Sequence, residues 1–273
     1  MSLAARIVVH GATGRMGQAL LRLLTEGSYG DALCLHAALA RPGHPLLGKD
    51  IGGRADGHAS VLFSDDIGAA LNDATGVIDF SQPAALTSLM QACIEHRVPL
   101  VTGTTGLDAD IQRALDKLAA HVPVVVAPNT SLGVHVLQHL AKEALRLLGP
   151  GFDAEIVEMH HRRKVDAPSG TALALAQCVA EQKKQALDSV MRTGREGQTG
   201  ARSADEIGVM ALRGGNVIGE HTLFLTSDYE RLELTHRAQD RSLFAAGALR
   251  AMQWLLSTKP APKIYGMGDV LLS

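Results

Sequence analysis

Residues 6–17 read R-I-V-V-H-G-A-T-G-R-M-G, and this stretch decides the fold of the first part of the chain. Ile7, Val8 and Val9 make a short apolar run that predicts a buried strand over residues 6–10. Three glycines follow at the spacing G-x-x-G-x-x-G, and a helical pattern continues over residues 18–26. A strand, a glycine loop and a helix in this order are typical of a dinucleotide-binding unit.

Each glycine of this loop has its own physical task. Gly11 permits a tight turn, Gly14 lets backbone N–H groups approach a pyrophosphate, and Gly17 permits close packing of helix on strand. The alternative is a tight strand-to-helix turn that binds nothing. We expect cofactor contacts from six consecutive residues: Gly11, Ala12, Thr13, Gly14, Arg15 and Met16.

Strand and helix patterns alternate up to residue 130, which is typical of a doubly wound parallel sheet. Further strands are expected over 33–40, 61–63, 76–80, 100–102 and 122–127, helices over 65–71, 83–96, 108–120 and 131–148, and a loop over 42–60. Ligands of such sheets bind beyond the carboxyl ends of the strands. Residues at two of these ends are therefore predicted to contact a nicotinamide, unless they are ordinary turn residues: Gly103, Thr104, Thr105, Ala127, Pro128, Asn129 and Thr130.

The end of the second strand bears on the choice of cofactor. A carboxylate there would hold the ribose 2′-hydroxyl of NAD, but residues 39–42 read L-A-R-P. Arg41 is instead placed to meet a 2′-phosphate, so we expect NADPH to be accepted. The alternative is that Arg41 stacks on the adenine or faces water.

A second decisive stretch covers residues 155–171, E-I-V-E-M-H-H-R-R-K-V-D-A-P-S-G-T. An apolar strand pattern leads into five consecutive basic residues, and Ser169, Gly170 and Thr171 are expected in the first turn of a helix that runs to about residue 187. Cations beside the free N–H groups of a helix start favour an anionic partner, most simply a small substrate with carboxylates. The alternative is a solvated basic face beside an ordinary helix cap.

After a polar loop over residues 192–203, three patterns over 207–213, 217–224 and 229–236 predict antiparallel strands joined by short turns. A last helix is expected over 242–257, followed by a short tail. The second half is therefore an α+β domain with a mixed or antiparallel sheet.

Composition excludes several classes of protein. A net charge of -2 over 273 residues gives no general attraction to nucleic acid or to a membrane, and no apolar run has membrane-spanning length. The three cysteines lack a C-x-x-C spacing and no leader peptide is visible, which favours a cytoplasmic setting. No metal site is expected from the histidines.

Taken together, the chain resembles the 4-hydroxy-tetrahydrodipicolinate reductase (dihydrodipicolinate reductase) family of bacterial lysine and diaminopimelate biosynthesis, almost from end to end. The motifs that carry the resemblance are GATGRMG at 11–17, IDFS at 78–81, GTTG at 103–106, NTSLGV at 129–134 and, above all, EMHHRRKVDAPSGTA at 158–172. The resemblance departs at Ala40, where some members carry Glu, and at Gln82, where they carry a basic residue. These departures leave the balance of NADH and NADPH open.

The resemblance implies a role for each matching position. His160 and Lys164 are similar to the catalytic pair of the family, and the implied substrate contacts are His161, Ser169, Gly170, Thr171 and Thr105. It also implies a reduction in which hydride from NADPH or NADH goes to ring C4 and His160 gives a proton. Residues 1–130 with 240–273 would bind the dinucleotide, and residues 131–239 would bind substrate and form a homotetramer.

Two rival functions remain open at this stage. One is a different two-domain dehydrogenase that acts on a semialdehyde or a polyol, although a thioester-forming enzyme needs a cysteine at a strand end, and Cys34, Cys93 and Cys178 are not so placed. The other is a cofactor-sensing protein that binds NADPH without oxidising it.

Overall fold

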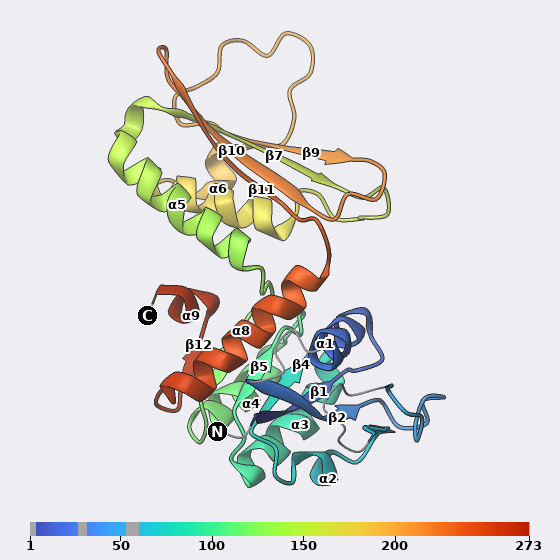
Figure 1. Cartoon of the computed structure of the whole chain (residues 1–273). Helices are drawn as coiled ribbons and strands as arrows, with labels where there is room; N and C mark the ends of the chain where they lie inside the picture. The colour runs from blue at the N-terminus through green and yellow to red at the C-terminus, as the bar shows by residue number, and fades with distance from the viewer. Residues whose placement is uncertain (1–3, 27–31, 53–59, 273) are drawn as a thin grey trace. The chain divides into compact units, whose positions relative to one another are not determined.

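The computed structural model describes residues 4–26, 32–52 and 60–272 of the chain. The chain forms two compact units, Met1–Leu132 with Arg241–Ser273 as unit 1, and Gly133–Asp240 as unit 2. Each unit has its own sheet (Figure 1). The chain begins in unit 1, forms the whole of unit 2, and returns to unit 1 for its last residues.

The sheet of unit 1 is parallel throughout, as predicted. Strand β1 (Ala5–His10) lies between β2 (Leu33–Leu39) and β4 (Gly76–Asp79). The strand order is β12-β6-β5-β4-β1-β2-β3, so the winding reverses between β1 and β4, where doubly wound sheets bind their ligands. The remaining strands are β3 (Phe63–Ser64), β5 (Leu100–Thr102), β6 (Val124–Val126) and β12 (Ile264–Tyr265).

Helices cover both faces of this sheet (Figure 1). Val9 of β1 shares a buried core with α1 (Arg15–Thr25) and α8 (Ser242–Thr258), whereas Val8 shares a different core with α3 (Pro83–His96) and α4 (Ala109–Ala119). This split follows from the alternation of side chains along a strand. The short helices α2 (Ile67–Leu71) and α9 (Met267–Leu272) complete the unit.

Unit 2 contains a mixed sheet in the order β11-β10-β7-β9-β8. Its long strands are β7 (Asp153–His160), β9 (Ile207–Arg213), β10 (Glu220–Thr226) and β11 (Arg231–Arg237), and β8 (Met191–Arg192) forms the edge. The prediction that residues 207–213 and 217–224 pair with each other is wrong. β7 lies between them and pairs with both. It forms a parallel ladder of seven residues with β9 and an antiparallel ladder of seven residues with β10.

One face of this sheet packs against α5 (Leu132–Leu148) and α6 (Gly170–Lys183), which bury Leu137 and Leu175 against Ile156 and Leu223. Gly149–Gly151 forms the short 3-10 turn η1 between α5 and β7. The helix predicted to reach residue 187 ends at Lys183, because Lys184 takes a left-handed conformation as its C-cap. A separate turn, α7 (Leu187–Val190), follows.

Other differences from the predicted elements are local. α1 begins at Arg15 rather than at residue 18, so Gly17 lies inside the helix. The predicted tail contains β12 and α9. Residues 53–59 of the predicted loop lie outside the described residues. In the part of the chain that the structure describes, each helix is too short or too polar to cross a membrane.

Candidate active site

The glycine loop of unit 1 joins β1 to α1 with very close backbone contacts. Gly11 has φ of +75°, and a Cβ atom at this position would lie 2.5 Å from the carbonyl oxygen of Phe80. At Gly17 a Cβ atom would lie 2.3 Å from the carbonyl oxygen of Gly11. Both positions therefore require glycine, as the sequence predicts.

The start of α1 suits an anion. Gly14 is its N-cap, and within the described residues no side chain caps the helix or places an acidic group in its first turn. The first N–H groups of a helix lack intrahelical partners and carry the positive end of the dipole. The predicted contacts Thr13 and Met16 are partly exposed beside the exposed Arg15, whereas Ala12 is buried. This arrangement fits the pyrophosphate of a dinucleotide.

A buried carboxylate ties the strand ends together next to this loop. Asp79 ends β4 and has no exposed surface. Its Oδ2 accepts hydrogen bonds of 2.7 Å from the hydroxyls of Thr102 and Thr104, and its Oδ1 lies 2.7 Å from His10 Nδ1. Burial opposes ionisation of Asp79, but hydrogen bonds, the strongest to His10, outweigh it and hold the pKa of the carboxyl below its usual value.

The hydroxyls expected at the ends of β5 and β6 are not all available to a ligand. Thr104 donates to Asp79, and Thr130 donates to the carbonyl of Phe244 at 2.7 Å. Both residues are buried, as are Gly103 and Ala127, whereas Thr105 and Pro128 are exposed. Asn129 is half-buried, and its Oδ1 accepts from the Ser131 amide at 2.9 Å. Thr105 is therefore the threonine whose side chain has access to solvent here.

Arg41 follows the end of β2 and is exposed. The preceding Ala40 donates its N–H to the carbonyl of Ser64 at 2.9 Å, which holds this turn against β3. Gln82 caps α3 without a side-chain hydrogen bond. The guanidinium of Arg41 thus stands on a fixed strand end, at the place where doubly wound folds discriminate the two dinucleotides.

In unit 2 the candidate acid–base group stands at the end of β7. His160 is its last residue, and its Nδ1 lies 2.6 Å from Oε2 of Glu158. Glu158 has no exposed surface and forms a two-point ion pair with Arg213 of β9, with N–O distances of 2.8 and 2.9 Å. Burial opposes ionisation of Glu158, but the bonds from Arg213 and His160 outweigh it and lower the pKa of the carboxyl.

The start of α6 lies beside this cluster. Ser169 is the N-cap, and its Oγ accepts from the Ala172 amide at 3.2 Å. The Ser169 amide donates to Glu158 Oε1 at 3.1 Å, and its Oγ lies 2.9 Å from His221 Nε2. Gly170 is exposed and Thr171 partly exposed, so the first turn of the helix, which begins where the sequence predicts, has solvent-accessible surface.

The basic run divides into residues with different surroundings. Lys164 Nζ lies 2.9 and 2.8 Å from the two carboxylate oxygens of Asp166, which lowers the pKa of Asp166. Arg163 donates to the Asn216 side chain at 2.7 Å. His161 lies beyond the end of β7 and is half-buried.

His221 of β10 is a further member of the cluster. Its ring lies edge-on to that of His160, with 5.1 Å between centroids, and it is 4% exposed. Burial, with the nearby charge of His160, lowers the pKa of His221 to about 4, so this imidazole is neutral at pH 7. Its Nδ1 has no hydrogen-bond partner among the described residues.

Sequence reasoning missed Glu158, Arg213 and His221 as site residues. Glu158 and His221 stand at inward positions of apolar strand patterns, beside Ile156 and Leu223, and a charged or polar group at such a position needs a partner. The sequence reading also overlooked His135 and His139, which stand four apart on α5. Within residues 4–26, 32–52 and 60–272, however, no group of three His, Cys, Asp or Glu residues could hold a metal ion.

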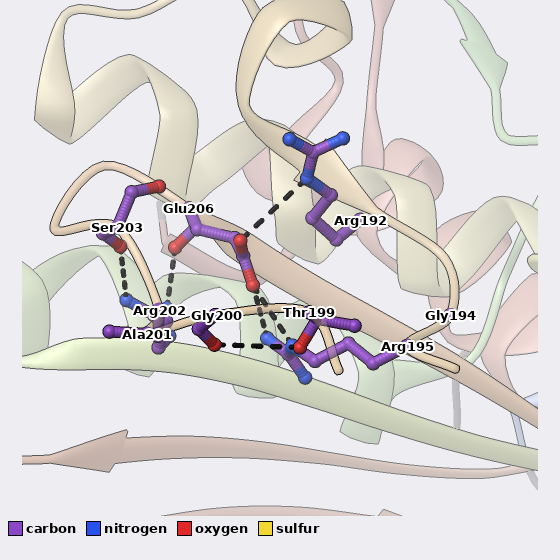
Figure 2. Close-up of a pocket in the computed structure, with 9 residues that line it drawn as sticks. All are labelled: Arg192, Gly194, Arg195, Thr199, Gly200, Ala201, Arg202, Ser203 and Glu206. Atoms are coloured by element: carbon purple, nitrogen blue, oxygen red, sulfur yellow. Dashed lines mark hydrogen bonds and ion pairs between the residues drawn. The ribbon is translucent and has the colours of Figure 1, made fainter. Parts of the chain in front are cut away.

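Unit 2 also contains a cavity of about 440 Å³ beside the loop before β9. Figure 2 shows Arg192 and Arg195 directed to the carboxylate of Glu206. Arg195 and Arg202 also pair with Glu155, at 2.7 and 2.9 Å. Because the arginines here are matched by carboxylates, this cavity offers no surplus charge for an anion.

Comparison with known proteins covers the whole chain. A family model described as dihydrodipicolinate reductase, N-terminus, matches residues 5–130, and one described as dihydrodipicolinate reductase, C-terminus, matches residues 133–271. The 4-hydroxy-tetrahydrodipicolinate reductase of Thiobacillus denitrificans is 44% identical over 269 residues, which are 98% of this chain and 99% of the relative. That of Magnetococcus marinus is 45% identical and covers 97% of this chain and 98% of its own.

Solved structures share the fold at lower identity. The dipicolinate-bound dihydrodipicolinate reductase from Paenisporosarcina sp. TG-14 has a TM-score of 0.75 at 22% identity, over 98% of this chain and 100% of its own. Aspartate semialdehyde dehydrogenase II from Vibrio cholerae has a TM-score of 0.52 at 11% identity, over 94% and 99%. At these identities the likeness concerns the fold alone, whereas the two family models and the full-length relatives decide the family. The chain belongs to the dihydrodipicolinate (4-hydroxy-tetrahydrodipicolinate) reductase family.

Proposed function

We propose that this protein reduces 4-hydroxy-tetrahydrodipicolinate to tetrahydrodipicolinate with NADPH or NADH, as a step of lysine and diaminopimelate biosynthesis. The observation that carries the proposal is the end of β7, where His160 stands beside the open first turn of α6. An acid–base group next to an anion-binding helix start fits a substrate that carries carboxylates and needs a proton.

The carboxylates of the substrate would bind at the first turn of α6. The amides of Gly170 and Thr171, at the start of α6, would donate to them, and Lys164 and His161 would add positive charge or hydrogen-bond donors. Ser169 has a different role in our proposal, because its amide and hydroxyl already bond to Glu158 and His221. A substrate carboxylate would compete with Asp166 for the Lys164 ammonium.

The side chains of unit 2 would deliver the proton. The substrate would lose its 4-hydroxyl as water, and ring C4 would then accept the hydride that a reduced nicotinamide carries. The neighbouring ring carbon must then gain a proton, and a histidine can both give and recover one near neutral pH. His160 has an 11% exposed side chain, so bulk water has little access to it. Lys164 and the helix start would stabilise negative charge on the substrate.

The dinucleotide would bind to unit 1, with its pyrophosphate on residues 11–16 and its nicotinamide near residues 103–105 and 127–130. Arg41 supports use of NADPH, because an exposed guanidinium follows β2 where an acidic residue would select NADH. Ala40 and Gln82 offer no charge of their own. We therefore propose that both cofactors are used and that Arg41 favours NADPH.

We also infer a homotetramer that forms through the sheet of unit 2. The face of this sheet opposite α5 and α6 carries apolar side chains that are only partly buried in the single chain, and 50% of Leu212 is exposed. The members of this face are Val157, Met159, Met210, Leu212 and Phe224. A second copy would cover them. Sedimentation of the protein and of Leu212→Glu tests this inference, because the variant should give the mass of a smaller species.

A coupled assay tests the activity. A synthase that makes the substrate is supplied in excess, and oxidation of NADPH and NADH is followed in separate reactions. Substrate-dependent oxidation with formation of tetrahydrodipicolinate is expected. Reduction of NADP⁺ or NAD⁺ by a semialdehyde or polyol instead would favour the rival dehydrogenase, and cofactor binding without any oxidation or reduction would favour a sensor.

A further inference from the structure

Glu158 is a buried charged residue to which the proposed mechanism gives no task. Its two carboxylate oxygens accept from four donors that come from three different elements. Oε2 faces His160 Nδ1 at 2.6 Å and Arg213 Nη1 at 2.8 Å. Oε1 faces Arg213 Nη2 at 2.9 Å and the Ser169 amide at 3.1 Å. One side chain thus contacts both the acid–base histidine and the start of α6.

The charge of Glu158 fixes the direction of its hydrogen bonds. An ionised carboxylate can only accept, so Nδ1 of His160 has to carry a hydrogen and donate it. The other ring nitrogen, Nε2, is then the one that gains and loses a proton. Ring orientation and tautomer are both set by the partner of the first nitrogen.

Glycine at position 219 avoids a close contact with Nε2. A Cβ atom on Gly219 would lie 3.0 Å from His160 Nε2, so a side chain at this position would crowd the nitrogen. The His221 ring packs edge-on against the imidazole. The charged and titratable groups around the pair are Glu158 on β7, Arg213 on β9, His221 on β10, His236 on β11, and Lys164 and Asp166 in the loop before α6.

We propose that Glu158 is the positioning residue of this site: it holds His160 in the Nδ1–H tautomer with Nε2 toward the reacting carbon, and it fixes the substrate-binding start of α6 relative to that nitrogen. Arg213 supports it by keeping the carboxylate ionised. This inference rests on the proposed function, because it assigns a task within the same site. Glu158 itself touches neither substrate nor cofactor in this proposal.

Glu158→Gln tests the proposal, and Glu155→Gln is its matched control. Glu155 stands on the same strand and also pairs with arginines, but among the described residues it bonds to Arg195 and Arg202 and to no histidine. In Glu158→Gln, kcat should fall by at least about tenfold, with little change in the affinity for NADPH, because a misplaced or wrongly protonated imidazole slows proton delivery. The control should keep the wild-type kcat.

Isotope effects separate positioning from loss of folded enzyme. If proton delivery becomes slower, the solvent deuterium effect on kcat should rise, and the effect of NADPH deuterated at the transferred position should fall. A smaller fraction of active enzyme changes neither ratio. An unchanged kcat with unchanged isotope effects in Glu158→Gln would overturn the proposal, and so would the same change in Glu155→Gln.

Two further measurements cover the remaining outcomes. If Glu158→Gln does not fold, Glu158→Gln with Arg213→Gln removes the unpaired buried cation and should show the same isotope effects. If the wild-type protein oxidises no cofactor with this substrate, the proposed function fails, but ¹⁵N spectra of labelled histidines still test the tautomer. The His160 signal, assigned with His160→Gln, should show Nδ1–H in the wild type and lose this preference in Glu158→Gln. Equal spectra would overturn the inference.

Discussion

Nδ1 of His10, at the end of β1, lies 2.7 Å from Oδ1 of Asp79, at the end of β4. These two strands flank the point at which the winding of the sheet reverses, and the glycine loop begins at the next residue, Gly11. The two threonines of the β5 end bond to the other carboxylate oxygen. A single buried anion therefore holds three strand ends of the proposed cofactor site.

Asp79→Asn should destabilise unit 1 by about 3 kcal/mol, because it removes a buried, hydrogen-bonded charge. In the folded state the pKa of Asp79 lies below its ordinary value of 3.8. As the pH falls through this range, the unfolded state therefore binds more protons than the folded state. The stabilisation from Asp79 is thus complete above this value and is lost in stronger acid. Urea unfolding at neutral and acid pH should show a weaker acid dependence in the variant. An equal dependence would contradict this assignment.

Gly17→Ala should damage the glycine loop, because the added methyl would meet Gly11 and Ala12 backbone atoms at 2.3 and 2.5 Å. Overpacking of this kind costs about 1–3 kcal/mol or more and would displace the N–H groups that we assign to the pyrophosphate. Gly68→Ala is the control, because its nearest atom is 3.6 Å away. Calorimetric titration with NADPH and thermal unfolding should show losses in the first variant alone.

Arg41→Ala should weaken NADPH binding by about tenfold and leave NADH binding nearly unchanged, because only NADPH carries the 2′-phosphate. Arg15→Ala provides the contrast, since the pyrophosphate that we assign to it is common to both cofactors. Fluorescence titrations of both variants with both cofactors measure the difference. Equal losses for NADPH and NADH in Arg41→Ala would show that this residue does not read the phosphate.

His221 should make the protein less stable in mild acid. Its pKa falls from 6.5 in the unfolded chain to about 4 in the folded protein, so the unfolded state binds more protons between these values. The free energy of unfolding should therefore fall as the pH drops through this window, by up to about 3 kcal/mol from this residue. Denaturation at about pH 7 and at about pH 4.5 should show a smaller drop in His221→Gln. His236, whose pKa is also lowered by burial, keeps part of the dependence in that variant.

The glycine loop and the alternation of strands and helices could be predicted because their signals are local. Apolar period and glycine spacing determine β1, its loop and α1 within a few residues. Strand partners could not be predicted from such local signals, since nothing in the sequence of residues 207–224 indicates that β7 lies between β9 and β10. The period of a strand tells which face is buried but not which neighbour it pairs with.

The candidate site likewise contains residues that local sequence indicates and residues that only the fold brings together. His160, Lys164 and the first turn of α6 come from one continuous stretch, so their residue types and the family resemblance could indicate them. Glu158 lies 55 residues from Arg213 and 11 from Ser169, and the folded sheet alone brings them together. The hydroxyl of Thr104 shows the opposite error, because a polar side chain at a strand end was expected to face ligand and instead bonds to Asp79.

Turnover of His160→Gln tests the central claim most directly, with the exposed His139→Gln as the control. Positioned proton transfer contributes about 100- to 10,000-fold to rate, so kcat should fall within this range while the dissociation constant for NADPH stays unchanged. The control should behave as the wild type. A His160→Gln enzyme that turns over 4-hydroxy-tetrahydrodipicolinate at the wild-type rate would contradict the account.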